Sequence, residues 1–162
     1  CSNKTSAIVR DHVLISARFD GGKREHMARA LNDALRKKGV NTFMVEAGLG
    51  ETFASQTIYG LNGMYAMIAF CFDDYGAMTA SKYSSFYELK YAYEHDIPII
   101  PIKMCKNWPP SPVDNNGKKK GAKQNNLVFS PSLVYLDWSN KAWNARACAD
   151  EIIAKSRILK VR

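Results

Sequence analysis

The stretch "KYSSFYELKYAYEHDIPIIPIKM", residues 82–104, decides the fold of this chain. Its first half has helical spacing, with Phe86, Leu89 and Tyr93 on an apolar stripe that we expect to face a sheet. Its second half, "IPIIPIKM", is an apolar run typical of a buried strand. One carboxylate, Glu88, lies a helical turn after a pair of serines and beside the stripe, which predicts a position at the rim of a cleft.

Strand-like and helix-like segments alternate along the whole chain. The strand-like runs are residues 12–19, 41–47, 65–72, 97–104 and 133–138. Helical patterns follow the first, second, third and fifth of these runs. Because parallel strands need a covering helix between them, the order predicts an α/β fold: a flavodoxin-like three-layer sandwich, with a five-stranded parallel sheet and helices on both faces. Pro98 and Pro101 place the fourth strand towards an edge.

Length and composition fit one folded domain. The chain has 162 residues, 46% hydrophobic and 23% charged, which suffices for one core but not for two ordinary domains. We expect an N-terminal tail at 1–10 and a single domain at 11–159, with a polar loop insertion at about 105–126. No apolar run approaches the roughly 20 residues that a membrane span needs. The chain begins at Cys1 rather than Met, and we interpret it as a domain cut from a longer protein.

The formal charge of +8 comes largely from two basic clusters. "RKK" at 36–38 ends a predicted helix, where cations complement the helix dipole. "GKKKGAK" at 117–123 has no interleaved aromatic residue, so we expect no nucleic-acid partner. The four cysteines are far apart and the three histidines add no metal-ligand spacing. We therefore expect reduced thiols in a cytoplasmic protein, and no bound metal.

Ligands of parallel sheets bind beyond the carboxyl ends of the strands, where the strand order reverses. The corresponding positions are 18–22, 47–53 and 73–75. A phosphoacceptor receiver domain would use acidic residues here, and Asp73 and Asp74 do follow the third strand. However, only Asp20 follows the first strand, and "YLDWSN" supplies no lysine at the fifth. The magnesium site of a receiver domain is therefore incomplete.

Three segments, in this order, resemble the Toll/interleukin-1 receptor (TIR) domain family. "LISAR" at 14–18 partly reproduces the family's Phe-Ile-Ser-Tyr-Arg-like box on the first strand. "GLGETF" at 48–53 matches the loop after the second strand. "SKYSSFYEL" at 81–89 supplies the serine and the Glu-Leu pair of a third characteristic segment. In order of elements, the resemblance extends over about residues 10–155.

The resemblance implies an activity and a catalytic residue. Enzymatic TIR domains cleave the bond between nicotinamide and ribose in NAD⁺, and their essential glutamate corresponds here to Glu88. NAD⁺ is then the substrate, and no cofactor is implied. Whether the product is ADP-ribose or a cyclic ADP-ribose stays open. The residues expected to bind substrate around Glu88 are Ser16, Arg18, Phe19, Leu49, Phe53, Tyr83 and Ser84.

The chemistry explains why one carboxylate is enough. Ordinary glycosidases use two carboxyl groups, one of which protonates a poor leaving group. Nicotinamide leaves a cationic pyridinium as a neutral molecule, so no general acid is required. The remaining task is to bind the ribose and stabilise an oxocarbenium-like transition state, which one ionised carboxylate can perform. Glu94, on the other side of the same predicted helix, is expected to be an ordinary solvated charge.

The resemblance leaves a second function open, a non-catalytic signalling adaptor. Such a module acts by TIR–TIR association, which we would place at the glycine-bearing loop and the neighbouring helices. The two functions overlap, because enzymatic TIR domains commonly self-associate to complete their site. We therefore expect other TIR domains, in homo-oligomers, as partners in either case.

Overall fold

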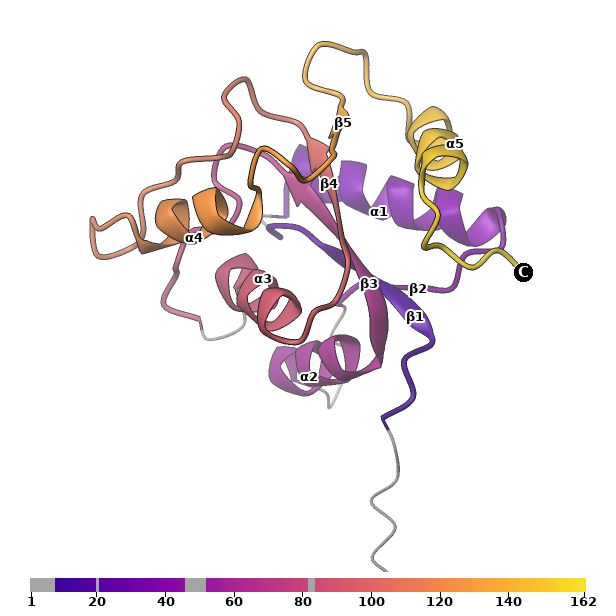
Figure 1. Ribbon diagram of the computed structural model, residues 1–162, viewed down its shortest axis with the longest axis horizontal. Helices are drawn as coiled ribbons and strands as arrows, with labels where there is room; N and C mark the ends of the chain where they lie inside the picture. Colours follow the sequence, from indigo (N-terminus) through magenta and orange to yellow (C-terminus); the bar gives the residue numbers. More distant parts are fainter. Residues whose placement is uncertain (1–7, 20, 46–51, 82–83) are drawn as a thin grey trace, which may run out of the picture.

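The computed structural model describes residues 8–19, 21–45, 52–81 and 84–162. One parallel sheet runs through the molecule in the order β2-β1-β3-β4-β5 (Figure 1). Its strands are β1 (His12–Ser16), β2 (Thr42–Phe43), β3 (Met64–Cys71), β4 (Ile99–Lys103) and β5 (Leu136–Asp137). The helices are α1 (Lys23–Lys37), α2 (Phe53–Gly63), α3 (Ser85–Glu94), α4 (Lys120–Val128) and α5 (Ala145–Lys155). The predicted flavodoxin-like α/β fold with five parallel strands is confirmed.

Helices cover both faces of the sheet. Helices α1 and α5 lie on one face, and α2 and α3 lie on the other, with α4 beside α3 (Figure 1). Alternation along β1 sends Val13 and Ile15 into the core under α1 and α5, and Leu14 into the core under α3. Ser16 follows the same alternation and therefore lies on the face that α3 covers.

The strand order reverses between β1 and β3. From β1 the chain moves outward to β2, and then crosses back to β3 on the other side of β1. The segments that leave β1 and β3 therefore diverge at the carboxyl edge of the sheet, which opens a crevice there. Residues 17–19 follow β1 and residues 72–79 follow β3 at this crevice.

Two predictions are wrong: the place of the fourth strand in the sheet and the burial of one residue on α3. Strand β4 lies between β3 and β5 rather than at an edge. The partner strand β5 pairs only with Ile102 and Lys103, so both prolines lie before the stretch that β5 covers. On α3, Phe86 and Leu89 are buried as expected, but Tyr93 is 49% exposed.

The segment expected to be a polar loop at 105–126 contains the start of α4. Helix α4 has lysines at its N-terminus and no acidic residue in its first turn, which the helix dipole disfavours. The negative charge comes instead from Asp114 in the preceding loop. Its carboxylate is buried and accepts hydrogen bonds from the backbone N–H groups of Met78 (3.0 Å), Lys120 (2.8 Å) and Gly121 (3.2 Å). Asp114 thus joins α4 to the segment that follows β3.

Arg10 holds the C-terminal end of α2. Its guanidinium donates to the carbonyl oxygens of Leu61 (3.1 Å), Asn62 (3.2 Å) and Met64 (3.2 Å). The last carbonyls of a helix have no partners within the helix, so a cation with several donors at this place satisfies them. None of the helices described combines the length and apolarity that a membrane crossing requires.

We predict that Asp114→Ala destabilises the fold. The substitution leaves three backbone N–H groups without their acceptor, and we expect a loss of about 2–4 kcal/mol in the free energy of unfolding. Denaturant unfolding followed by circular dichroism measures this loss. The exposed Asp33 on α1 provides the control, because Asp33→Ala should change stability by less than about 0.5 kcal/mol. Equal effects of the two substitutions would contradict the role of Asp114.

Candidate active site

A buried carboxyl group lies at the carboxyl edge of the sheet. The side chain of Glu88 is on the first turn of α3, and the residue is only 3% exposed. Ser16, the last residue of β1, donates a hydrogen bond from its Oγ to Glu88 Oε1 over 2.9 Å. Glu88 therefore lies deeper than the rim position that helical spacing predicted, because α3 packs directly over the end of β1.

Burial changes the protonation of this group. Desolvation raises the pKa of Glu88 from 4.5 to about 8, although the hydrogen bond from Ser16 lowers it. With a pKa near 8, roughly one Glu88 side chain in ten is ionised at pH 7. The carboxyl group is thus held mainly neutral in the free protein, and a nearby positive charge would favour its anion.

The two serines before Glu88 have different environments. Ser85 Oγ accepts a hydrogen bond from the backbone N–H of Gly76 over 2.9 Å, which ties α3 to the turn after β3. Ser84 precedes the helix, and its side chain makes no capping hydrogen bond. Its Oγ is buried and has no hydrogen-bond partner within the part of the chain that the structure describes. Ser84 Oγ is therefore available to a bound molecule.

A cavity of about 370 Å³ opens beside these groups. Within the described residues it brings together five of the predicted site residues: Arg18, Phe19, Phe53, Ser84 and Glu88. Ser16 is the hydrogen-bond donor to Glu88 and lies behind the cavity wall. Leu49 and Tyr83, the other two predicted substrate-binding residues, lie outside the described residues.

Phe53 and Arg18 lie at the open side of this cavity. Phe53 begins α2 and is 62% exposed. The Arg18 guanidinium, which is about half exposed, pairs with Asp74 over 3.3 Å. Arg24 on α1 pairs with Asp73 (3.1 Å) and Asp74 (3.3 Å). The two aspartates that a receiver domain would use for magnesium are therefore neutralised by arginines, and no group of three or more potential metal ligands occurs among the described residues.

Sequence reasoning missed several residues of the site. The cavity is also lined by Ala17, Val45, Thr57, Ala77, Thr79, Ser81 and Ser85. Tyr75 lies behind it, with its hydroxyl 2.8 Å from Ser16 Oγ. Tyr75 fell within a segment singled out by strand order, but nothing in the sequence indicated that its ring turns inward. Thr57, which is buried on α2, carries no sequence signal of its own.

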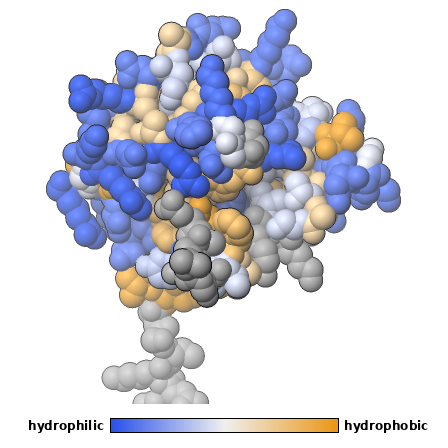
Figure 2. Space-filling view, turned by 180° about the vertical axis from the view of Figure 1, so that it is seen from behind, coloured by the Kyte–Doolittle hydropathy of each residue, from blue (hydrophilic) through white to orange (hydrophobic). Residues whose placement is uncertain are grey.

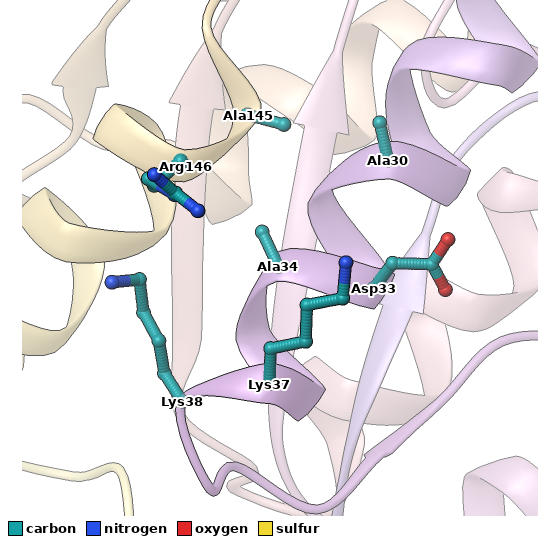
Figure 3. A pocket seen from close by; sticks show the side chains of 7 residues that line it. All are labelled: Ala30, Asp33, Ala34, Lys37, Lys38, Ala145 and Arg146. Carbon is teal, nitrogen blue, oxygen red and sulfur yellow. The ribbon is translucent and has the colours of Figure 1, made fainter.

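A larger cavity of about 590 Å³ lies elsewhere, between α1 and α5. Its walls carry Lys37, Lys38 and Arg146, over a floor of small residues, while Asp33 points away from α5 (Figure 3). Lys38 already pairs with Asp150, and the other lysine ends α1, where a cation complements the helix dipole. Of the described residues that line this groove, only Asp33 carries a carboxylate and none is aromatic, so the groove does not resemble a site for cleaving a ribosyl bond.

Comparisons with solved structures identify the class of fold. The chain aligns with the TIR domains of the activated Roq1 resistosome, which directly recognises the pathogen effector XopQ, at a TM-score of 0.62 and 16% identity, over 89% of this chain and 98% of that one. It also aligns with the RPS4 and RRS1 TIR domain heterodimer, at a TM-score of 0.53 and 13% identity, over 88% of this chain and 93% of that one.

A third similar structure is a metazoan TIR-STING receptor from C. gigas in complex with 2′,3′-cGAMP. The TM-score is 0.54 at 13% identity, over 96% of this chain but only 43% of the receptor chain. No protein-family model matches the sequence, and no curated protein shows significant sequence similarity to it. The chain therefore has the fold of a TIR domain, as the sequence motifs predicted.

We predict that the burial of Glu88 makes the stability of the protein depend on pH. The pKa of Glu88 in the folded protein lies above its ordinary value, so the fold favours the neutral carboxyl. This contribution is complete below about pH 4.5 and is lost as the pH rises to about 8. Relative to Glu88→Gln, the wild-type free energy of unfolding should fall by up to about 1.4 kcal/mol per pH unit in this window.

Thermal unfolding at pH 5 and pH 8 measures the effect. Glu88→Gln should melt above the wild type at pH 8, and the difference should shrink or reverse at pH 5. Glu94→Gln is the matched control, because Glu94 is an exposed glutamate on the same helix. It should follow the wild type at both pH values. If the melting temperatures of wild type and Glu88→Gln differ by the same amount at pH 5 and pH 8, the predicted effect of burial is contradicted.

Proposed function

We propose that this protein is an NAD⁺ glycohydrolase that cleaves the nicotinamide–ribose bond. The observation that carries the proposal is the buried Glu88 carboxyl, which accepts a hydrogen bond from Ser16 beside a cavity with aromatic and cationic side chains. A desolvated carboxyl in a cleft, with a strongly raised pKa, is the kind of group that active sites contain. The TIR-domain fold supports the proposal by analogy.

The reaction balances without a cofactor. Water and NAD⁺ give nicotinamide, ADP-ribose and a proton. The bond between ribose C1′ and the pyridinium nitrogen breaks, its electron pair leaves with neutral nicotinamide, and water oxygen forms the new bond to C1′. Positive charge that develops on the ribose is stabilised by the Glu88 anion in a site of low dielectric. Capture by the adenine ring in place of water would give a cyclic ADP-ribose, which remains an alternative product.

The raised pKa fits a cationic substrate. In the free protein the neutral carboxyl avoids the desolvation cost of a buried anion. A pyridinium bound in the cavity favours the ionised form, so substrate binding and proton release from Glu88 are coupled. Only the ionised form stabilises the ribosyl cation. We therefore expect kcat/KM to rise with pH up to about 8.

The remaining residues of the cavity suit the other parts of NAD⁺. The unpartnered Ser84 Oγ is placed to bond a ribose hydroxyl. Phe19 and Phe53 offer rings against which nicotinamide can pack. Arg18 already holds the carboxylate of Asp74, and a diphosphate oxygen can take the place of that carboxylate. For Leu49 and Tyr83, the roles of closing over nicotinamide and of an aromatic wall stay predictions from the sequence.

The test is nicotinamide release from NAD⁺, followed by chromatography with concentrated protein at pH 6.5 and 8.5. Wild type should release nicotinamide, faster at the higher pH, and Glu88→Gln should lower the rate by at least about a hundredfold because the anion is lost. Glu94→Gln should retain the wild-type rate. If concentrated wild-type protein releases none, or if the two variants are equally active, the proposal fails.

A second candidate function, a non-catalytic module that acts by TIR–TIR association, is favoured by one surface. Helix α2 exposes Phe53 (62%), Ile58 (51%) and Tyr59 (61%). Figure 2 shows hydrophobic side chains at the lower end of the molecule, where both α2 and the first described residues of the chain lie in Figure 1. Exposed apolar side chains that cluster on one helix are typical of an interaction surface. The RPS4 and RRS1 structure is itself a heterodimer of TIR domains.

We predict that Ile58→Lys weakens self-association. A charge at this position would have to be desolvated in any interface that buries α2, so we expect at least a tenfold weaker association constant. Light scattering and sedimentation over a range of concentrations measure it. Val134→Lys is the control, since Val134 is 84% exposed and lies before β5, away from α2. Equal association of the two variants would exclude α2 from the interface.

A further inference from the structure

Glu88 is the end of a chain of three hydrogen-bonded side chains. Ser16 Oγ lies 2.9 Å from Glu88 Oε1 and 2.8 Å from the hydroxyl of Tyr75. All three residues are buried, with exposures of 0% for Ser16, 1% for Tyr75 and 3% for Glu88. The chain links the end of β1, the turn after β3 and the first turn of α3.

Counting hydroxyl hydrogens fixes the direction of this chain. Ser16 and Tyr75 have one hydroxyl hydrogen each, and an ionised carboxylate can only accept. When Glu88 is ionised, Ser16 must therefore give its hydrogen to Glu88. The hydroxyl of Tyr75 must then donate to Ser16 Oγ, because two acceptors cannot bond each other. Donation by the phenol also polarises the serine hydroxyl and strengthens its bond to Glu88.

The position of Tyr75 is set by contacts on several sides. The backbone N–H of Tyr75 donates to Phe72 O (3.1 Å), and its carbonyl accepts from Asn125 Nδ2 on α4 (2.8 Å). Asn125 also donates to Pro110 O (2.9 Å). The next residue is Gly76, whose φ of +86° favours glycine, and a Cβ there would collide with the Asn125 side chain. The tyrosine hydroxyl therefore has little freedom to leave Ser16.

We propose that Tyr75 is a positioning residue, whose hydroxyl commits the single hydroxyl hydrogen of Ser16 to Glu88. The consequence for catalysis rests on the proposed function, but the effect on Glu88 does not. Tyr75 does not itself exchange a proton in this arrangement. Burial, and then the neighbouring Cys71 and Glu88, raise the pKa of Tyr75, so its hydroxyl remains a donor at neutral and mildly alkaline pH.

Among the described residues, few other charged or titratable groups come from the elements around Glu88. From the segment after β1, Arg18 lines the same cavity. The turn after β3 carries Tyr75, with Cys71 behind it. The same turn carries Asp73 and Asp74, whose carboxylates pair with Arg24 and Arg18. The part of α2 that lines the cavity contributes Phe53 and Thr57, which carry no charge. A change in the pKa of Glu88 after removal of the Tyr75 hydroxyl therefore points to the hydrogen-bond chain.

The test is a titration of Glu88 by NMR, with ¹³C-labelled glutamate side chains and the Glu88 signal assigned by its loss in Glu88→Gln. Tyr75→Phe keeps the ring and removes the hydroxyl. Ser16 is then free to rotate away, and we expect the pKa of Glu88 to rise by about 0.5 to 1 pH unit. Tyr65→Phe is the control, because Tyr65 lies on β3, the strand that leads into the turn with Tyr75. Its hydroxyl accepts a hydrogen bond from the backbone N–H of Lys160 (3.0 Å) and takes no part in the hydrogen-bond chain. This substitution should leave the titration unchanged.

A double substitution tests the route of the effect. If Tyr75 acts through Ser16, then Tyr75→Phe should produce no further shift once Ser16→Ala is present. An unchanged Glu88 titration in Tyr75→Phe, or an equal shift with and without Ser16, overturns the proposal. Should Tyr75→Phe not fold, 3-fluorotyrosine at position 75 replaces it. Its more acidic hydroxyl is a stronger donor and should lower the pKa of Glu88, and an unchanged or raised value again overturns the proposal.

Catalysis gives a separate readout. If the protein cleaves NAD⁺, the rise of kcat/KM with pH should move upward in Tyr75→Phe by the same amount as the titration, and Tyr65→Phe should retain the wild-type profile. A wild type that titrates as expected but releases no nicotinamide refutes the proposed function and leaves the role of Tyr75 in orienting Ser16 supported. A cleavage profile that does not move, in a variant whose titration has moved, refutes Glu88 as the group that controls the pH dependence.

Discussion

The hydrogen bond between Ser16 and Glu88 is the contact on which the rest of the site depends. It joins the end of a central strand to a helix that covers the sheet, in a place from which water is largely excluded. A carboxyl group there must either be neutral or receive hydrogen bonds. The structure satisfies this constraint in two ways. Ser16, in the sheet, donates a hydrogen bond to Glu88, and the pKa of Glu88 is raised so that the neutral form dominates. One oxygen of Glu88 is thus held in place while the carboxyl remains next to the cavity.

This contact follows from the order of the strands. Because β1 and β3 are neighbours although β2 comes between them in sequence, the chain segments that leave them separate at the carboxyl edge. Ser16 is the last residue of β1, Tyr75 belongs to the segment that leaves β3, and the first turn of α3 meets both at Glu88. The same crossing places α2, which follows β2, along the far side of the cavity, so that three successive strand-to-helix connections contribute to it.

Much of the fold could be predicted from the chain, because the apolar run of β3 and the repeated alternation of strand and helix are local patterns. The identity of Glu88 as the candidate came from the resemblance to TIR domains. Its depth could not be predicted, since that depends on Ser16, which is distant in sequence. Helix α4 was missed for a related reason. Lysines at its N-terminus argue against a helix, and the compensating carboxylate of Asp114 stands outside the helix itself. Similarly, Tyr93 has the right helical spacing but lies near the end of α3, where it is exposed.

Helix α2 connects the contact made by Arg10 to the mouth of the cavity. Arg10 precedes β1 and donates hydrogen bonds to carbonyl oxygens at the C-terminal end of α2. Phe53 begins the other end of the helix, at the mouth of the cavity. Helix α2 has 11 residues and a length of about 16 Å. An α-helix of this length behaves as a stiff rod, so its two ends cannot shift independently. Arg10, just before β1, and Phe53, at the cavity mouth, are therefore attached to the same rigid segment, some three turns of helix apart.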